Sequence, residues 1–217
     1  LSDLTYGVLF IADEVMCGMG RTGSLFALEQ EGIAADITTL AKGLGAGYQP
    51  IAALMAAENV IRIIKNGSGT LWNGHTYMSH AIATAGALAV QQVIEEENLL
   101  TDVRTRGEQL RKGLQTRLSQ NPHVGNIRGR GLFWTVELVQ DRTTKQPFNA
   151  TLGLAPKVRE IALDLGLMCY PSQGCADGTQ GDHVLLAPAY TSTRKEIETI
   201  CDLITQAIET ALTGLEA

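Results

Sequence analysis

Val8-Leu9-Phe10-Ile11-Ala12-Asp13 decides the fold class of this chain, because five apolar residues in a row end at a carboxylate. A short continuous apolar run of this kind is typical of a strand buried on both faces, as in a parallel sheet. Asp36 to Leu40 is a second short strand candidate, and Lys42 follows it. Ligands bind beyond the carboxyl ends of the strands in open α/β sheets. The pattern therefore predicts an α/β fold with Asp13 and Lys42 at the ligand-binding edge.

The arrangement of apolar residues divides the chain into two regions. Early runs are short and continuous, whereas residues 132–139 partly alternate, as in an antiparallel strand with one wet face. The further predicted elements are an apolar run at 50–56, helices at 79–96, 99–120, 154–165 and 194–212, and strands at 132–139 and 184–187. This order predicts a small α+β domain that follows a boundary near residue 98.

Composition argues against several classes of function. The 217 residues carry a formal net charge of −6 and no run of Lys or Arg, so we expect no binding to nucleic acid. The four cysteines and four histidines show no metal-ligand spacing, so we expect no metal site. No apolar run approaches the roughly 18 residues that a membrane span needs, so we expect no membrane contact. Small-molecule chemistry or protein contact is the function class that remains.

The start of the chain bears on its location. Leu1 is followed within a few residues by the strand-like run, so we expect a piece of a longer fold. Four cysteines without a pairing pattern are typical of reduced thiols in an intracellular protein. We therefore predict a cytoplasmic location, which a targeting signal upstream of Leu1 would change.

Asp13 and Lys42 are the candidate chemical groups. An ionised aspartate inside a protein needs a partner, because burying it alone is costly. Lys42 lies between Ala41 and Gly43, so a ligand can approach its amine closely, and desolvation would make it a nucleophile and base. A lysine in a glycine-rich loop is more often solvated, and an aspartate after a strand is often a turn former. The loop Gly43 to Gly47 has neither the P-loop nor the dinucleotide-binding spacing.

The sequence around these residues resembles the signature of the class III, or omega-amino-acid, aminotransferases. The resemblance rests on the order and spacing of several motifs and covers nearly the whole chain. The matching segments are Leu9-Phe10-Ile11-Ala12-Asp13-Glu14-Val15, Gly18-Met19-Gly20-Arg21-Thr22-Gly23, Asp36-Ile37, Leu40-Ala41-Lys42-Gly43-Leu44-Gly45, Gly74-His75-Thr76-Tyr77, Gly129-Arg130-Gly131-Leu132-Phe133 and Gly181-Asp182-His183-Val184. Several motifs at matching intervals are more specific than any one of them.

The resemblance implies an architecture. Residues 1–98 would be the C-terminal part of the large domain of a fold type I transferase that depends on pyridoxal phosphate. Residues 99–217 would be a long connecting helix and a small C-terminal α+β domain. The family likeness also implies a homodimer that uses a small-molecule amine donor and a keto-acid acceptor. In this family the N-terminal half of the protein supplies part of the phosphate site and much of the substrate pocket.

The resemblance also implies roles for four residues. Lys42 would hold pyridoxal phosphate covalently and, once released, would move a proton between the donor and the cofactor. Asp13 would keep the pyridine nitrogen protonated, so that the ring accepts electrons. Val15 would pack on one face of the ring. Thr76 would reach the phosphate of the neighbouring subunit's cofactor.

The chain departs from the family pattern at three positions. Met16 stands where many relatives have a Gln that contacts the ring hydroxyl of the cofactor. Gln180 stands where relatives commonly have an Arg that can meet a substrate carboxylate, and an amide lacks its charged, two-pronged contact. Ala189 replaces a second proline.

Two further functions stay open at this point. An aminomutase or lyase on the same scaffold would use Lys42 and Asp13 equally well. A non-catalytic remnant, which binds the cofactor weakly or only forms dimers, would lack the N-terminal half.

Overall fold

The structure is a computed structural model that describes residues 6–216, and it divides the chain into two units, Leu1–Thr101 and Asp102–Ala217. The division falls in the first turn of helix α4 (Leu99–Leu118), which was predicted over residues 99–120. The assignment of the two spans to a large and a small domain stays a prediction. Each unit has its own sheet.

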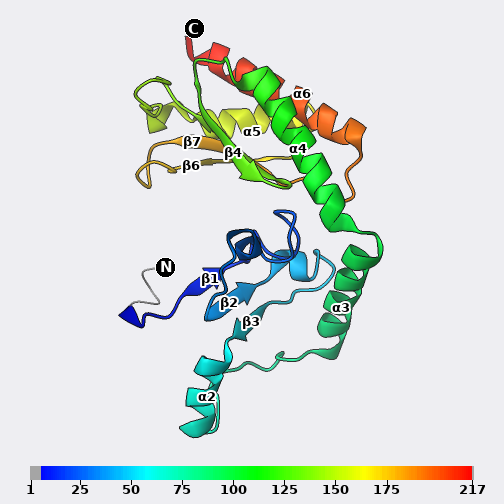
Figure 1. The fold of residues 1–217 in the computed structure, drawn as a ribbon. Helices are drawn as coiled ribbons and strands as arrows, with labels where there is room; N and C mark the ends of the chain where they lie inside the picture. The colour runs from blue at the N-terminus through cyan, green and yellow to red at the C-terminus, as the bar shows by residue number, and fades with distance from the viewer. Residues whose placement is uncertain (1–5, 217) are drawn as a thin grey trace. The chain divides into compact units, whose positions relative to one another are not determined.

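Unit 1 contains a three-stranded sheet with the order β1-β2-β3 (Figure 1). Strands β1 (Ile11–Asp13) and β2 (Ile37–Leu40) are parallel, which confirms the parallel pairing expected from the two short apolar runs. Strand β3 (Ala53–Ala56) pairs with β2 in the antiparallel direction. The mixed sheet therefore places the carboxyl ends of β1 and β2 at one edge.

The prediction that residues 8–12 form a strand buried on both faces is wrong for the described chain. The strand has only three residues, and the side chains of Val8, Leu9 and Ile11 are 59 %, 52 % and 59 % exposed. The reason is that β1 lies at the edge of its sheet, and β2 is its only partner strand among residues 6–216. Of the run, only Ala12 is buried.

Unit 1 contains four further elements, two helices and two short turns. Helix α3 (Ala81–Glu96) begins after His80, whose ring accepts a hydrogen bond from the amide of Ala83, close to the predicted start at residue 79. Helix α2 (Glu58–Asn66) was not predicted. Two short 3₁₀ turns, η1 (Ala27–Glu31) and η2 (Lys42–Leu44), follow β1 and β2 respectively. The Gln91 amide of α3 donates to the carbonyl of Leu44 over 3.4 Å, which ties α3 to η2.

Unit 2 contains a four-stranded antiparallel sheet with the order β4-β5-β7-β6. Strand β5 (Phe133–Leu138) alternates between half-buried and buried side chains, as the sequence predicted for residues 132–139. Its neighbour β7 (Asp182–Leu186) matches the strand predicted at 184–187. The outer strands β4 (Val124–Arg130) and β6 (Tyr170–Gln173) were not predicted, because Gly and Arg interrupt the pattern of the first and Pro171 lies in the second.

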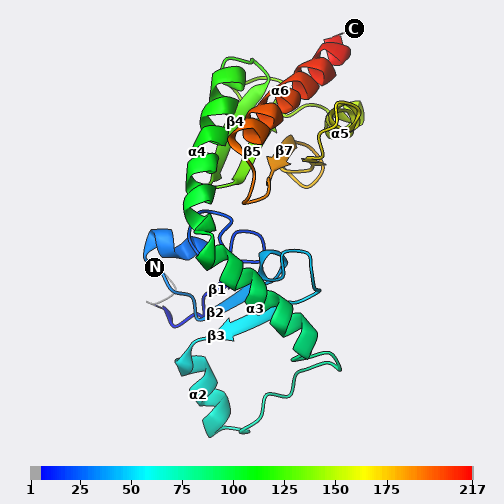
Figure 2. The same cartoon turned by 90° about the vertical axis from the view of Figure 1, so that its right-hand side faces the viewer.

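The core of the molecule lies in unit 2. Helices α4, α5 (Leu154–Asp164) and α6 (Arg194–Glu216) pack apolar side chains against the sheet, and a short turn, η3 (Ala150–Leu152), precedes α5. Figure 2 shows α4 and α6 side by side. Fully buried side chains from these elements include Leu110, Leu114, Val136, Leu154, Val158, Ile204 and Ile208. Each contributes about 1.5–3 kcal/mol of hydrophobic free energy, so unit 2 is stabilised mainly by its own residues.

Candidate functional site

The pairing of β1 and β2 fixes where Asp13 and Lys42 lie. Asp13 is the last residue of β1 and is in register with Thr39 of β2. Lys42 lies two positions beyond Leu40, the last residue of β2. Because the strands are parallel, Asp13 at the carboxyl end of β1 and Lys42 just beyond the carboxyl end of β2 lie at the same edge, which is the edge that the sequence predicted.

Lys42 has an unusual backbone. Its φ angle is 41°, in the left-handed region, where a side chain is strained by about 1–2 kcal/mol. It is the first residue of η2, and Gly43 follows it. Non-glycine residues in this region concentrate at functional sites, where the surrounding structure determines them. Five other described non-glycine residues share this region, Met19, Ala46, Ser79, Asn98 and Lys145, so the strain supports a function of Lys42 only together with its place at the sheet edge.

The amine of Lys42 points back to the loop that follows β1. Its Nζ lies 2.7 Å from Sδ of Met16, three residues beyond Asp13. The side chain is exposed, so residues 6–216 do not supply the desolvation that we expected from the sequence. Asp13 is also exposed, and its Oδ1 accepts a hydrogen bond of 3.0 Å from the amide of Val15. One edge of the sheet thus brings together the amine and the loop that carries Asp13 and Val15.

Glu14 is a residue of this region that the sequence did not single out. It is only 2 % exposed, and its carboxylate accepts hydrogen bonds from the amides of Ala27, over 2.8 Å, and Leu28, over 3.0 Å. Burial, and then the charge of Glu14, raises the pKa of the Cys17 thiol to about 11. Gly18 fits against the Glu14 carbonyl, since a Cβ there would lie 2.6 Å from that oxygen. Glu14 therefore holds the loop after β1 in place. Its position next to Asp13 was the only signal in the sequence.

Thr76 is not brought to this edge by the described residues. It lies in the segment 67–80 between α2 and α3, and it is exposed. The neighbouring turn is held by a hydrogen bond of 3.1 Å from the amide of Tyr77 to the His75 ring. Between residues 6 and 216, no hydrogen bond links Thr76 to Asp13, Val15 or Lys42. The role of Thr76 stays a prediction.

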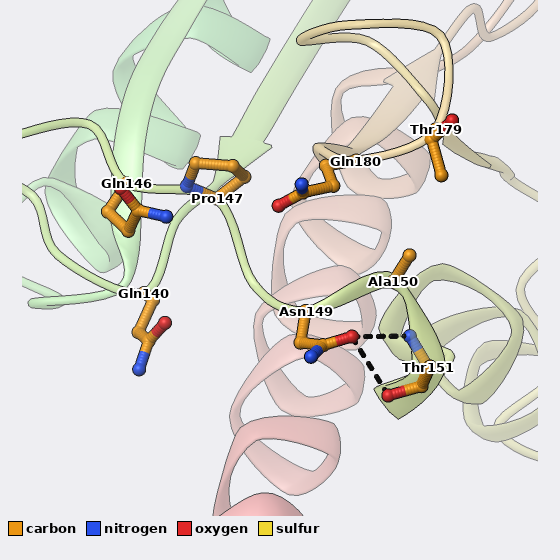
Figure 3. A pocket seen from close by; sticks show the side chains of 8 residues that line it. All are labelled: Gln140, Gln146, Pro147, Asn149, Ala150, Thr151, Thr179 and Gln180. Atoms are coloured by element: carbon orange, nitrogen blue, oxygen red, sulfur yellow. Dashed lines mark hydrogen bonds between the residues drawn. The ribbon is translucent and has the colours of Figure 1, made fainter.

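Gln180 lines a separate hollow in unit 2, shown in Figure 3. The hollow has a volume of about 450 Å³, and four carboxamide side chains line it, those of Gln140, Gln146, Asn149 and Gln180. None of its lining residues carries a charge. The backbone amide of Gln180 donates to the carboxylate of Asp177 over 2.7 Å. The side chain of Gln180 points toward the segment of Gln146 and Pro147 (Figure 3). The position where the family resemblance led us to expect a cation therefore presents a neutral amide.

The described part of the chain shows neither a metal-binding cluster nor a membrane span. Residues 6–216 contain no group of three or more His, Cys, Asp or Glu side chains that could hold a metal ion. Among the same residues, no helix is long and apolar enough to cross a bilayer.

Comparison with known proteins gives a consistent family. The model of the class-III aminotransferases matches residues 4–208. An aminotransferase of Gibberella zeae is 48 % identical and is covered over 41 % of its own length by 95 % of this chain. A solved transaminase from the marine bacterium Virgibacillus is 34 % identical with a TM-score of 0.91, over 99 % of this chain and 48 % of that one.

A solved amine transaminase from an uncultivated Pseudomonas species, in a form with pyridoxal phosphate bound, is 34 % identical with a TM-score of 0.84, over 97 % of this chain and 45 % of that one. The chain spans about half the length of the relatives that it matches. Its α/β fold, with a mixed sheet in unit 1 and an antiparallel sheet in unit 2, is consistent with part of a fold type I transferase. With this fold and a family match along almost its entire length, the chain belongs to the class III aminotransferases.

Proposed function

We propose that this chain carries the cofactor-holding residues of a transaminase that depends on pyridoxal phosphate. The enzyme would move an amino group from an amine or omega-amino acid to a keto acid. The observation that carries the proposal is the placement of Lys42, in a strained backbone, beside the loop of Asp13 at one sheet edge. The family match and the cofactor-bound relative support it.

The residues at this edge suit pyridoxal phosphate. When bound, the cofactor supplies an aldehyde for amines and a ring that accepts electrons. Lys42 offers an exposed primary amine, which has a thioether rather than a carboxylate as its contact among residues 6–216. Asp13 offers an exposed carboxylate whose Oδ1 is already oriented by the amide of Val15. An amine and a fixed negative charge are the two groups that the aldehyde and the pyridine nitrogen require.

Each residue then has a defined task. Nζ of Lys42 would hold the cofactor, and the free amine would take a proton from the donor carbon as a base and return it as an acid. The Asp13 carboxylate keeps a positive charge on the pyridine nitrogen. Val15 packs against the ring. Thr76 would donate its hydroxyl to the phosphate held by a second subunit, so the active enzyme would be a homodimer. We also propose a cytoplasmic location, because the cysteines show no pairing pattern.

The experiment that tests this proposal is covalent labelling of the full-length protein. Borohydride reduction after addition of pyridoxal phosphate should fix the label to Lys42, and peptide mapping should locate it. Lys65, an exposed lysine of α2 that pairs with Glu58, is the internal control. A label on Lys65 or Lys112 in place of Lys42 would refute the assignment. Separate half-reactions with donor and acceptor then distinguish transfer from an aminomutase or lyase.

A further inference from the structure

Two consecutive carboxylates at the end of β1 have opposite surroundings. Asp13 is exposed, whereas Glu14 is only 2 % exposed. Among residues 6–101, the described part of unit 1, Glu14 is the one carboxylate that is buried. Burying a carboxylate is costly unless hydrogen bonds compensate it, so the partners of Glu14 show what its burial achieves.

Glu14 ties the end of β1 to two neighbouring elements. Its carboxylate accepts hydrogen bonds from the amides of Ala27 and Leu28, the first two residues of η1. Its backbone amide donates to the carbonyl of Thr39 on β2 over 3.1 Å. Glu14 is thus fixed twice, by β2 through its backbone and by η1 through its side chain.

Glu14 is also the middle residue of the turn that orients the Asp13 carboxylate. In this turn, Oδ1 of Asp13 accepts from the amide of Val15 over 3.0 Å. The direction of that amide depends on the backbone angles of the residue between them, which is Glu14. Because Glu14 is fixed by both β2 and η1, the amide of Val15 and the carboxylate of Asp13 are fixed with it.

From these contacts we infer that Glu14 is a positioning residue for pyridoxal phosphate, which acts by setting the place of the Asp13 carboxylate. The inference rests on the proposed function, in which Asp13 keeps a positive charge on the pyridine nitrogen. The attraction between two opposite charges depends on their separation, so a shift of the Asp13 carboxylate weakens the binding of the cofactor. Glu14 acts from inside the loop, because two backbone amides already occupy its carboxylate.

Titration of pyridoxal phosphate into the full-length apoprotein, followed by visible absorbance, measures the effect as a dissociation constant. Glu14→Gln keeps the size of the side chain but turns an NH₂ group toward one of the two amides, so the turn should shift. The dissociation constant should rise about tenfold or more. Glu29→Gln is the matched control, because the exposed Glu29 accepts from a single amide, that of Phe26, beside the same turn. It should change the dissociation constant by less than about twofold.

A double-mutant cycle separates positioning from a general loss of structure. Once Asp13→Asn has removed the charge, its exact place matters little, so adding Glu14→Gln should raise the dissociation constant further by less than about threefold. A purely structural role gives the full effect again in this background, and that outcome overturns the inference. So does an unchanged dissociation constant in Glu14→Gln alone. If the wild type does not bind the cofactor, or if Asp13→Asn binds it as tightly, the proposed function fails and the inference fails with it.

A second variant decides the case in which Glu14→Gln does not fold, as circular dichroism will show. Ala27→Pro removes one of the two amide donors and leaves Glu14 in place. Proline is favoured at the first position of a helical turn, and Phe26 already has the extended backbone, with φ −113° and ψ 139°, that a following proline requires. Ala27→Pro should therefore fold, raise the dissociation constant about tenfold, and lose this effect when Asp13→Asn is added. An effect of the same size with and without Asp13→Asn overturns the inference.

Discussion

At the residue scale, Asp13 is the carboxylate whose charge matters most to the proposed chemistry. Asp13→Asn in the full-length protein should keep the fold, because the Asn oxygen can still accept from the amide of Val15. The donor half-reaction at saturating cofactor should slow. Its activation free energy should rise by several kcal/mol, since a neutral pyridine accepts electrons poorly. Asp164→Asn, at the exposed end of α5, is the control. A loss smaller than about tenfold argues against the role of Asp13.

Gln180 bears on the choice of acceptor. Gln180→Arg should raise kcat/KM for a dicarboxylic keto acid relative to a monocarboxylic one, by about tenfold, because a guanidinium binds a carboxylate through two hydrogen bonds. Thr179→Arg adds the same charge to the same hollow one position earlier and should change the ratio much less. Steady-state kinetics with both acceptors measures this. Equal effects of the two variants would show that only net charge matters.

Single residues show where the sequence was sufficient and where it was not. Asp13 and Lys42 were placed correctly at one sheet edge because the ends of parallel strands meet there. Glu14 was missed, because its partners are backbone amides 13 and 14 positions away that no side-chain pattern reveals. The left-handed backbone of Lys42 was also hidden, since lysine gives no signal for it. The tasks of Val15 and Thr76 rest on the family resemblance alone.

At the scale of elements, strand β7 contains a histidine that burial makes sensitive to pH. Burial, and then the nearby charge of Arg128, lowers the pKa of His183, whereas Glu137 and Asp182 act in the opposite direction. Its cross-strand neighbours are Glu137 of β5 and Ser172 of β6, and its Nδ1 is buried without a partner among residues 6–216. The unfolded chain therefore binds a proton more readily than the folded one.

The free energy of unfolding should therefore depend on pH. The contribution of His183 is fully present above the unfolded pKa of about 6.5 and is lost as the pH falls below it, toward the folded pKa. His183→Gln should make the free energy of unfolding fall less steeply over that range, as chemical denaturation at a series of pH values will show. His75→Gln, an exposed histidine, is the control. An unchanged slope in His183→Gln contradicts the expectation.

The predicted elements succeeded where apolar periodicity was strong. Helices α3, α4, α5 and α6 begin within two residues of their predicted starts. Strands β4 and β6 failed, since edge strands tolerate Gly, Arg and Pro that disrupt alternation. The predicted bounds and burial of the strand at residues 8–12 were wrong for a different reason. The sequence shows that a residue is apolar, but it does not show which neighbours cover that residue.

At the scale of the whole molecule, the two units differ in how much they bury. Unit 1 leaves Ile11, Leu54 and Met55 of its small sheet at least half exposed, in contrast to the core of unit 2. We therefore expect residues 1–217, expressed alone, to aggregate or to lack transaminase activity. The visible absorbance after addition of pyridoxal phosphate, and its change with a donor amine, will measure this. Turnover at about 1 per second or faster contradicts the expectation.

Assembly offers a separate prediction for the full-length protein. If Thr76 serves the cofactor of a second subunit, Lys42→Ala and Thr76→Val are inactive or weak alone but lie in different halves of a shared site. A mixture of the two variants should regain activity, because one of the two sites in each hybrid dimer is intact. Mass spectrometry verifies the exchange of subunits. If the subunits exchange and no transaminase activity returns, a shared site is excluded.

The left-handed backbone of Lys42 also means that folding and turnover select different residues at one position. Glycine adopts a φ angle of 41° without strain, so Lys42→Gly should fold at least as well as the wild type. In a library of all 20 residues, a screen for abundance would enrich glycine and asparagine at this position. A screen for growth that depends on amino-group transfer would retain lysine alone. A site at which two such screens disagree marks chemistry without any knowledge of the substrate.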